Sequence, residues 1–280
     1  ERDIAKRHER RRVRPGDAGW PAPQHWDTLK AQVDGNLSKP GALFAACAAD
    51  SNDANCIAAT KQLGNPFFIG DQAGGTQVSG WLNAWSPAPS AYAVAAHKPE
   101  DVVAAVNFAR THKLRLAVKG GGHSYQGTST APDSLLIWTR TLPALTLPAA
   151  CVPEGHGESA PRSVKRFASG RATIMEAPVP AVTIQAGAMW VDAYDAVMTK
   201  AHRYVQGGGC MTVGVAGLVQ SGGFGSFSKR YGTAASSLLQ AEVVTADGGR
   251  RIVNAERDGD LFWGLKGGGG GSLAVVTSLT

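Results

Sequence analysis

Gly120-Gly121-Gly122-His123-Ser124-Tyr125-Gln126-Gly127 and Gly207-Gly208-Gly209-Cys210-Met211-Thr212-Val213-Gly214 each present one nucleophilic side chain among glycines. Glycine lets backbone amides approach a ligand closely and adopt dihedrals that other residues resist. One histidine and one cysteine presented in this way can both reach a single flat molecule. We therefore predict a large phosphate-bearing cofactor at these two loops, with His123 and Cys210 as anchors rather than metal ligands.

A strand, a helix and a second strand are predicted before each glycine loop. Residues 91–97 alternate like a strand, Pro99 suits the first turn of a helix, and residues 114–118 alternate again. Before the second loop the same order is predicted for residues 181–186, 189–201 and 203–205. Ligands of α/β sheets bind where strands end and the chain turns, so both loops are placed for one crevice.

The whole chain divides into a basic tail and approach segment (1–40), a helical and loop region (41–90) and a ligand-binding domain (91–280) that contains both glycine loops. Within that domain, residues 141–180 are rich in Pro, Ala and charge and are predicted to form a surface excursion. Downstream we predict a hairpin turn at 246–249 between strands 239–245 and 251–254, a helix at 258–266 and a strand at 273–280. The predicted class is α+β with mixed sheets.

The net charge of +6 does not indicate a nucleic-acid partner. Residues 1–14 hold seven Lys/Arg against three Asp/Glu, which leaves only +2 for the other 266 residues. A terminal basic run is typical of a solvated tail. The sequence holds no run of about eighteen apolar residues, so it does not predict a transmembrane helix.

Cys47 and Cys56 bracket a short polar stretch, and a disulfide between them would close a small loop. Two separately packed thiols are the alternative. We favour the disulfide, which implies an oxidising compartment and hence a secreted or periplasmic location. Cys151 has no obvious partner in the sequence.

Several common site motifs are absent from the sequence. There is no G-x-x-x-x-G-K-[ST] loop, no G-x-G-x-x-G before a helix, no G-x-S-x-G elbow and no close pairing of histidines. P-loop, Rossmann, hydrolase and metal sites are therefore disfavoured.

Three blocks in order resemble the berberine-bridge-enzyme-like branch of vanillyl-alcohol-oxidase-type (p-cresol-methylhydroxylase-type) flavoproteins. They are Val118–Tyr125, then Cys210–Gly225 followed by Lys229-Arg230-Tyr231-Gly232, and Asp258–Gly271 with Val275-Val276-Thr277. The resemblance covers about residues 90–280. It implies two α/β subdomains with mixed sheets that sandwich FAD.

On this resemblance, His123 bonds to the methyl carbon of the flavin's benzene ring and Cys210 to the neighbouring ring carbon. An electron-poor isoalloxazine can be attacked by imidazole nitrogen or by thiolate. Amides of the first loop would hold the pyrophosphate. The other implied cofactor-binding residues are Lys119, Gly120, Gly121, Gly122, Ser124, Tyr125, Gly127, Thr212, Val213, Gly214, Gly217, Gly222, Gly223, Gly225, Tyr231 and Val276.

The implied activity is that of an oxidase, in which a substrate gives hydride to FAD and oxygen is reduced to hydrogen peroxide. Val213 matches a position where a small aliphatic residue is associated with oxygen access to the flavin. The substrate could be an alcohol, a sugar or a benzylic or alkaloid-like compound. Departures from the family pattern are Met211, Ala216, Leu218 and Gln220.

The family continues, after the strand at 273–280, into a substrate domain that carries the catalytic acid or base. The sequence therefore predicts that a second polypeptide supplies this domain and that the catalytic base lies outside these residues. Two alternatives remain open. Cys210 could be the nucleophile of an acyl-transfer enzyme with His123 or His202 as base, or the chain could be a non-enzymatic flavin-binding subunit.

Overall fold

The computed structural model describes residues 12–143, 145–146, 166–168, 171–173 and 181–280. Most of the predicted surface excursion, most of the basic tail and Cys151 lie outside these residues. The chain divides into two compact units, which are described one at a time: Glu1–Trp138 with Ala246–Gly248, and Thr139–Thr245 with Gly249–Thr280.

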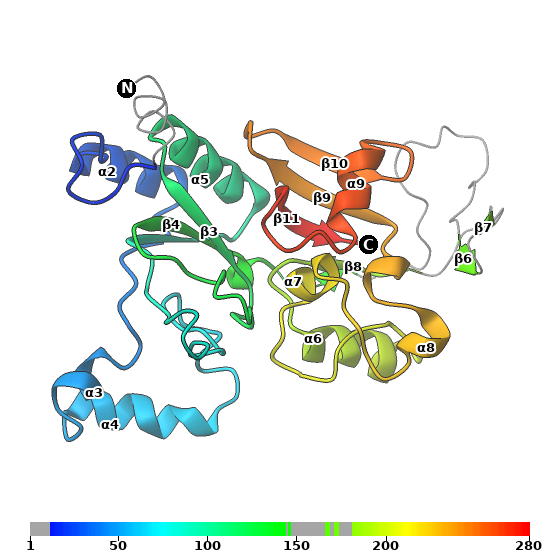
Figure 1. Cartoon of the computed structure of the whole chain (residues 1–280), viewed down its shortest axis with the longest axis horizontal. Coiled ribbons are helices and arrows are strands. Elements are labelled where there is room, and N and C mark those ends of the chain that lie inside the picture. The colour runs from blue at the N-terminus through cyan, green and yellow to red at the C-terminus, as the bar shows by residue number, and fades with distance from the viewer. Residues whose placement is uncertain (1–11, 144, 147–165, 169–170, 174–180) are drawn as a thin grey trace. The chain divides into compact units, whose positions relative to one another are not determined.

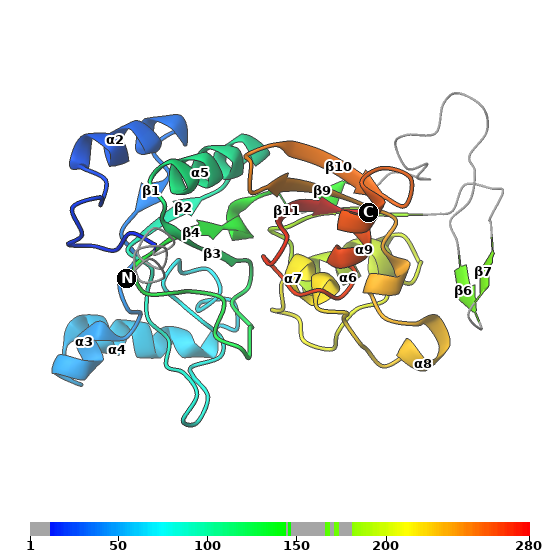
Figure 2. The ribbon, with the colours of Figure 1, turned by 45° about the horizontal axis from the view of Figure 1, so that its top comes forward.

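The first unit is built on a mixed sheet of order β1-β2-β4-β3. Its strands are β1 (Leu37–Ser38), β2 (Tyr92–Ala95), β3 (Arg115–Lys119) and β4 (Ser134–Trp138). β4 pairs in parallel with both β2 and β3, whereas β1 is antiparallel to β2. Helices α2 (Pro23–Gln32) and α5 (Pro99–Thr111) lie side by side, and α5 packs on the sheet (Figures 1 and 2).

Aromatic rings join α2 to the sheet and to α5. Trp26 stacks on Tyr92 of β2 with ring centroids 3.7 Å apart, and its centroid lies 4.8 Å from that of Phe108 on α5. Pro99 opens α5 as predicted, and the Asp101 carboxylate accepts hydrogen bonds from the backbone N–H groups of His97 (2.8 Å) and Lys98 (3.2 Å). These bonds satisfy backbone donors at a helix start, which explains why the helix begins there.

The central strand of this sheet, β4, has no counterpart in the sequence predictions. Its sequence, Ser134-Leu135-Leu136-Ile137-Trp138, is a continuous apolar run whose first four residues are buried. A strand covered on both faces shows no alternation, so its period cannot be read. The predicted strand, helix and strand before the first loop are present, and β4 inserts between the two strands.

The region 41–90 contains short helices, as predicted: α3 (Ala45–Ala49), α4 (Ala54–Lys61) and the 3₁₀ turn η1 (Gln62–Gly64). Asp53 caps α4 by accepting a 2.7 Å hydrogen bond from the N–H of Asn55. The predicted disulfide is present, with the Cα atoms of Cys47 and Cys56 4.7 Å apart. It joins α3 to α4.

The second unit contains a five-stranded antiparallel sheet of order β10-β9-β11-β8-β5. Its strands are β5 (Leu145–Thr146), β8 (Thr183–Gln185), β9 (Gln240–Thr245), β10 (Arg250–Asn254) and β11 (Ala274–Leu279); β6 (Arg166–Ala168) and β7 (Arg171–Thr173) form a separate pair. The helical segments are η2 (Thr139–Thr141), α6 (Trp190–Tyr194), the π-helix η3 (Asp195–Lys200), α7 (Val215–Gln220), α8 (Ser228–Tyr231), η4 (Ala235–Ser237) and α9 (Gly259–Leu265).

Most predicted elements of this unit are confirmed, including the strands on either side of the 246–249 turn, and one expectation is wrong. The α+β class is confirmed, with a mixed sheet in the first unit and an antiparallel sheet in the second. Residues 203–205 form a loop instead of a strand. The Tyr204 ring packs against Phe227 and Tyr231, at centroid distances of 5.6 and 5.0 Å, so this aromatic residue serves a side-chain cluster rather than a sheet.

Loss of the disulfide should loosen α3 and α4 without unfolding the unit. The two cysteines are 9 positions apart in the sequence, and closing so short a loop stabilises the fold by about 2–3 kcal/mol. We expect a Cys47→Ser, Cys56→Ser variant to show faster amide hydrogen exchange over residues 45–61, with Cys210→Ser as the matched control. Unchanged protection of these amides would contradict the expectation.

Candidate functional site

The first glycine loop begins where β3 ends, and a buried ammonium fixes that point. Lys119, the last residue of β3, is only 2% exposed. Its Nζ donates hydrogen bonds to the carbonyl oxygens of Gln72 (2.6 Å), Ala73 (2.7 Å) and Gly75 (2.9 Å). The same ammonium lies 5.3 Å from the ring centroid of Trp138, at the end of β4. Lys119 therefore ties the 72–75 segment to the ends of two neighbouring strands.

Burial lowers the pKa of Lys119 to about 7, because removing an ammonium from water disfavours its charged form. The side chain faces protein carbonyls rather than open space. The structure thus gives Lys119, predicted to bind the cofactor, a role in holding the loop.

The loop itself is closed by its own hydroxyls and by the 72–77 segment. Ser124 Oγ accepts hydrogen bonds from the backbone N–H groups of Gln126 and Thr128, both at 3.2 Å. Gly122 has a φ of 82°, and its carbonyl accepts a 2.9 Å hydrogen bond from the N–H of Gln77. His123 is half-buried between these fixed points. Its backbone is therefore held from both sides.

The second loop runs along the start of α6. The backbone N–H of Trp190 donates to the carbonyl of Val213 (3.0 Å), and that of Val191 donates to the carbonyl of Met211 (3.1 Å). Gly207 lies under the indole of Trp190, where a Cβ atom would come within 2.3 Å of the ring. Glycine is needed at 207 because an aromatic ring covers it.

Cys210 presents its thiol to solvent from this loop. The residue is exposed, and its Sγ lies 3.5 Å from the hydroxyl oxygen of the buried Thr212. A Cβ atom on Gly209 would meet nothing within 4 Å. The thiol therefore sits beside open space that a flat ring can enter.

The remaining predicted residues of this unit serve different roles. Gly214 is the N-cap residue of α7, and Tyr231 ends α8 within the aromatic cluster with Tyr204. A Cβ on Gly225 would lie 1.9 Å from the carbonyl oxygen of Gly207, so Gly225 allows backbone packing. Gly217 lies in α7, Gly222 and Gly223 follow it in a turn, and Val276 is buried in β11. Gly217 and Gly222 also face open space.

Two polar residues near the second loop escaped the sequence predictions. Gln206 is buried and donates from Nε2 to Ser228 Oγ (2.8 Å), which in turn accepts from the N–H of Gly225 (2.8 Å). Gln220 of α7 donates to the carbonyl of Ala216 (3.0 Å), while its buried Oε1 has no partner among the described residues. Gln206 carries no motif, so only the packing reveals it, whereas the sequence marked Gln220 only as a departure from the family pattern.

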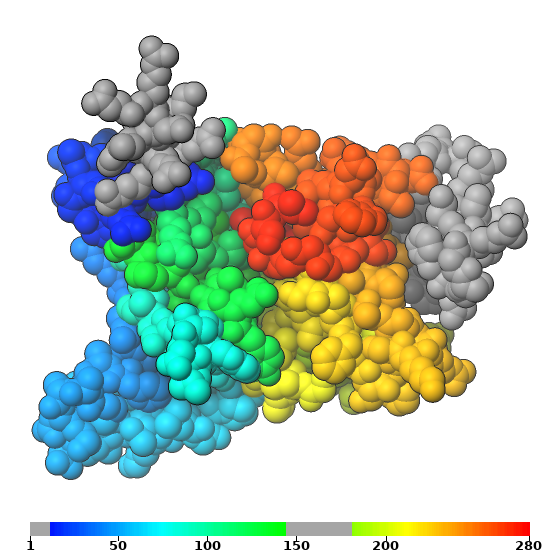
Figure 3. Space-filling model, viewed as in Figure 1, coloured from blue at the N-terminus to red at the C-terminus, as the bar shows by residue number. Residues whose placement is uncertain are grey.

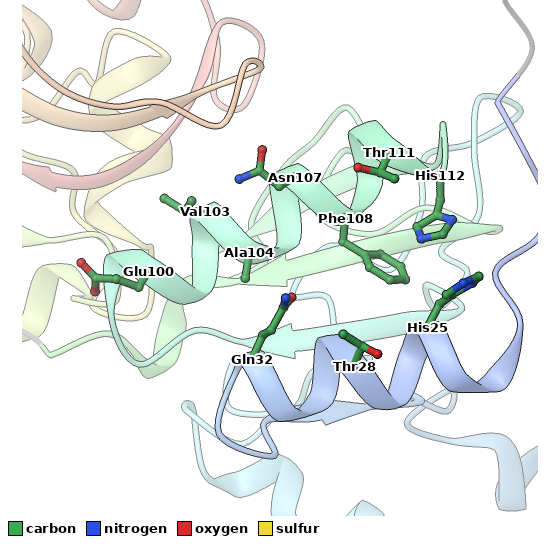
Figure 4. A pocket seen from close by; sticks show the side chains of 10 residues that line it. All are labelled: His25, Thr28, Gln32, Glu100, Val103, Ala104, Asn107, Phe108, Thr111 and His112. Atoms are coloured by element: carbon green, nitrogen blue, oxygen red, sulfur yellow. The ribbon is translucent and has the colours of Figure 1, made fainter.

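A groove between α2 and α5 in the first unit, with a volume of about 380 Å³, contains neither loop (Figure 4). His25 and His112 line one end, with ring centroids 4.9 Å apart. Burial, followed by the nearby charge of His25, lowers the pKa of His112. Within the described residues there is no cluster of three metal-binding side chains and no helix suited to cross a membrane.

His123 and the first loop belong to the first unit, and Cys210 and the second loop to the second. The family model of the FAD binding domain matches residues 89–147 and 179–254, which include both loops. These two segments are similar to the FAD binding domain family.

Known flavoproteins are similar to this chain in sequence and structure over almost its whole length. The VAO-type flavoprotein oxidase VAO615 of Thermothelomyces thermophilus is 32% identical over 96% of this chain and 46% of its own length. The crystal structure of VAO-type flavoprotein MtVAO615 from Myceliophthora thermophila C1 matches 96% of this chain and 48% of its own, with a TM-score of 0.74 and 29% identity.

A glucooligosaccharide oxidase from Acremonium strictum with a 6-S-cysteinyl, 8α-N1-histidyl FAD matches 68% of this chain and 34% of its own. Its TM-score is 0.53 and its identity 26%. The chain spans about half the length of the curated relatives it matches. Each relative is a single chain that contains the matched region, so the comparisons do not support the predicted second polypeptide.

The described residues fit FAD. Gly209, Gly217 and Gly222 border open space, which leaves their backbone accessible to a ligand. The FAD-binding domain identifies the cofactor as FAD.

Stability should depend on pH through Lys119. In the folded chain this pKa is about 7, whereas the ordinary value is 10.5, so between these pH values the unfolded chain binds more protons. The free energy of unfolding therefore rises with pH in this window. Relative to Lys119→Met, we expect the wild-type chain to gain about 1–2 kcal/mol of stability between pH 7 and pH 9. Denaturant titrations at each pH measure this.

The exposed Lys30→Met change is the control and should leave the pH dependence unaltered. Parallel pH profiles for the wild-type chain and Lys119→Met would disprove the role of the buried ammonium.

Proposed function

We propose that this chain is the FAD-binding part of a flavin-dependent oxidase and that the flavin is attached through both His123 and Cys210. The observation that carries the proposal is the match of the FAD-binding-domain model across two segments, each of which contains one of these nucleophiles. The names of the relatives, FAD-linked oxidoreductases and a VAO-type oxidase, support the activity.

The local environments of the two nucleophiles support the double attachment. Cys210 combines solvent access with a hydroxyl neighbour, Thr212, whose oxygen lies 3.5 Å from the sulfur. His123 is presented by a loop that is bonded at Gly122 and at Ser124. The oxidase from Acremonium strictum, with its cysteinyl and histidyl FAD, is a precedent for the same pair of residue types.

Bound FAD would accept hydride from a substrate carbon and deliver the electrons to oxygen, which leaves as hydrogen peroxide. In this scheme the chain's own residues bind and orient rather than transfer protons. Gly120–Ser124 would hold the pyrophosphate through backbone N–H groups. Val213, half-buried beside Cys210, would leave room for oxygen. The substrate would be an alcohol, a sugar or a benzylic or alkaloid-like compound.

The acyl-transfer alternative requires a base at the Cys210 thiol. The hydrogen-bond neighbour that the structure gives this thiol is the Thr212 hydroxyl, which is not a general base at neutral pH. The Cys47–Cys56 disulfide further supports a secreted or periplasmic protein.

The test is the visible absorption of the protein after acid denaturation. The wild-type protein should stay yellow, and His123→Ala and Cys210→Ala should each retain flavin through the other bond. The double variant should release its flavin. The two single variants should also differ in the position of the absorption bands, because different ring carbons remain substituted.

Gln126→Ala serves as a control that changes an exposed side chain of the same loop and should keep both bonds. Complete flavin release from either single variant would refute double attachment, and a colourless wild-type protein expressed with flavin would refute the proposed function.

A further inference from the structure

Two histidines from distant parts of the sequence meet at one end of the groove between α2 and α5. His25 is the third residue of α2, and His112 directly follows the last residue of α5. Their ring centroids lie 4.9 Å apart, with the ring planes tilted by 40°. Figure 4 shows the two imidazoles turned toward each other across the groove. The spacing of histidines in the sequence does not reveal this pair, because it forms only when the two helices pack.

The backbone holds both histidines in place. The N–H of His25 donates to the carbonyl of Ala22 (2.9 Å) in the first turn of α2, and the N–H of His112 donates to the carbonyl of Phe108 (3.0 Å) in the last turn of α5. The helices are joined by the contact between the rings of Trp26 and Phe108, whose centroids are 4.8 Å apart. Groups presented in this way lose little freedom when they bind a ligand.

The two side chains differ in exposure. His112 is half-buried, and its ring centroid lies 4.5 Å from that of Phe108. His25 is exposed on α2, and the residues of this helix lie at the molecular surface in the space-filling view (Figure 3). The groove between them and the rest of α5 has a volume of about 380 Å³, which is room for several water molecules. The pair is therefore open to an ion from solvent.

The separation of the two rings fits two ligands of one metal ion. A bond of about 2.0–2.1 Å from a ring nitrogen places the metal roughly 3 Å from the ring centroid. Two imidazoles on one ion, at an angle between about 90° and 109°, therefore place their centroids about 4.5–5 Å apart. The observed centroid distance is 4.9 Å. The tilt of 40° is neither the offset stack nor the edge-to-face arrangement that aromatic rings prefer when they only pack together.

We propose that His25 and His112 form a site for a divalent transition-metal ion and that this site takes Cu²⁺ more tightly than Zn²⁺. Imidazole nitrogen suits both ions, and divalent copper is the stronger binder at a given nitrogen site. Among the residues that the structure describes, no third His, Cys, Asp or Glu completes a cluster with the pair, so water from the groove fills the remaining positions. The bound ion links the start of α2 to the end of α5. The site lies within the first unit and is independent of the flavin.

The test is titration of the whole protein with Cu²⁺, followed by calorimetry and by electron paramagnetic resonance at one equivalent. The wild-type spectrum should show coupling to two imidazole nitrogens, and that of His25→Ala to one. His25→Ala and His112→Ala should each lower the affinity about tenfold to a hundredfold, because loss of a ligand costs at least as much as loss of a group that orients one. His97→Ala removes an exposed histidine of the same unit, outside the groove, and should change neither result.

Hydrogen exchange with Zn²⁺ gives a second readout. Saturating Zn²⁺ should slow amide exchange in α2 of the wild-type protein and leave it unchanged in His25→Ala. Because His25 is exposed, this variant keeps the fold even if His112→Ala, which loses a ring packed on Phe108, does not. Equal Cu²⁺ affinities in His25→Ala and His97→Ala would overturn the proposal. So would a wild-type spectrum with a single nitrogen, or α2 exchange that does not respond to Zn²⁺.

Discussion

The buried ammonium of Lys119 is the interaction on which the first glycine loop depends. A charge removed from water is tolerated only where hydrogen bonds replace its hydration. Here three carbonyl oxygens of the 72–75 segment accept those bonds, and the Trp138 ring lies on another side. One side chain therefore gathers the ends of β3 and β4 and a segment more than forty residues earlier in the chain. The His123 loop starts from this point.

The sequence predicted the fold wherever a pattern is local. Pro99 with Asp101 marks the start of α5, and the turn at 246–249 marks a hairpin, because each signal acts within a few residues. The sequence predictions failed where contacts with distant parts of the chain determine the local structure. β4 is covered on both faces and shows no period, while the apolar residue Tyr204 packs into an aromatic cluster instead of a strand. The antiparallel second sheet depends on pairings that no single segment encodes.

The glycines illustrate a similar limit in the candidate site. Sequence reasoning gives every glycine in the two loops the same meaning, a close approach to a ligand. The structure separates them, because Gly207 and Gly225 are required by the Trp190 ring and by a neighbouring carbonyl, whereas Gly209 borders open space. The interpretation of Lys119 changes in the same way, from a predicted cofactor-binding residue to one that holds the loop. The sequence singles out the two loops as a candidate site, but only the structure separates glycines that support packing from glycines that border open space.

Different contacts hold the backbone of the loops that carry the two nucleophiles. The His123 loop is held by the buried ammonium of Lys119 and by the Ser124 hydroxyl. The Cys210 loop is held by the Trp190 indole that covers Gly207 and by backbone hydrogen bonds to α6. Hydrogen bonds that link Gln206, Ser228 and Gly225 also support it. A group whose backbone is already fixed loses little freedom when it forms a bond. Because the supports belong to separate units, a change in one loop need not disturb the other. Under the proposed double attachment, each nucleophile would therefore keep its own reactivity toward the flavin.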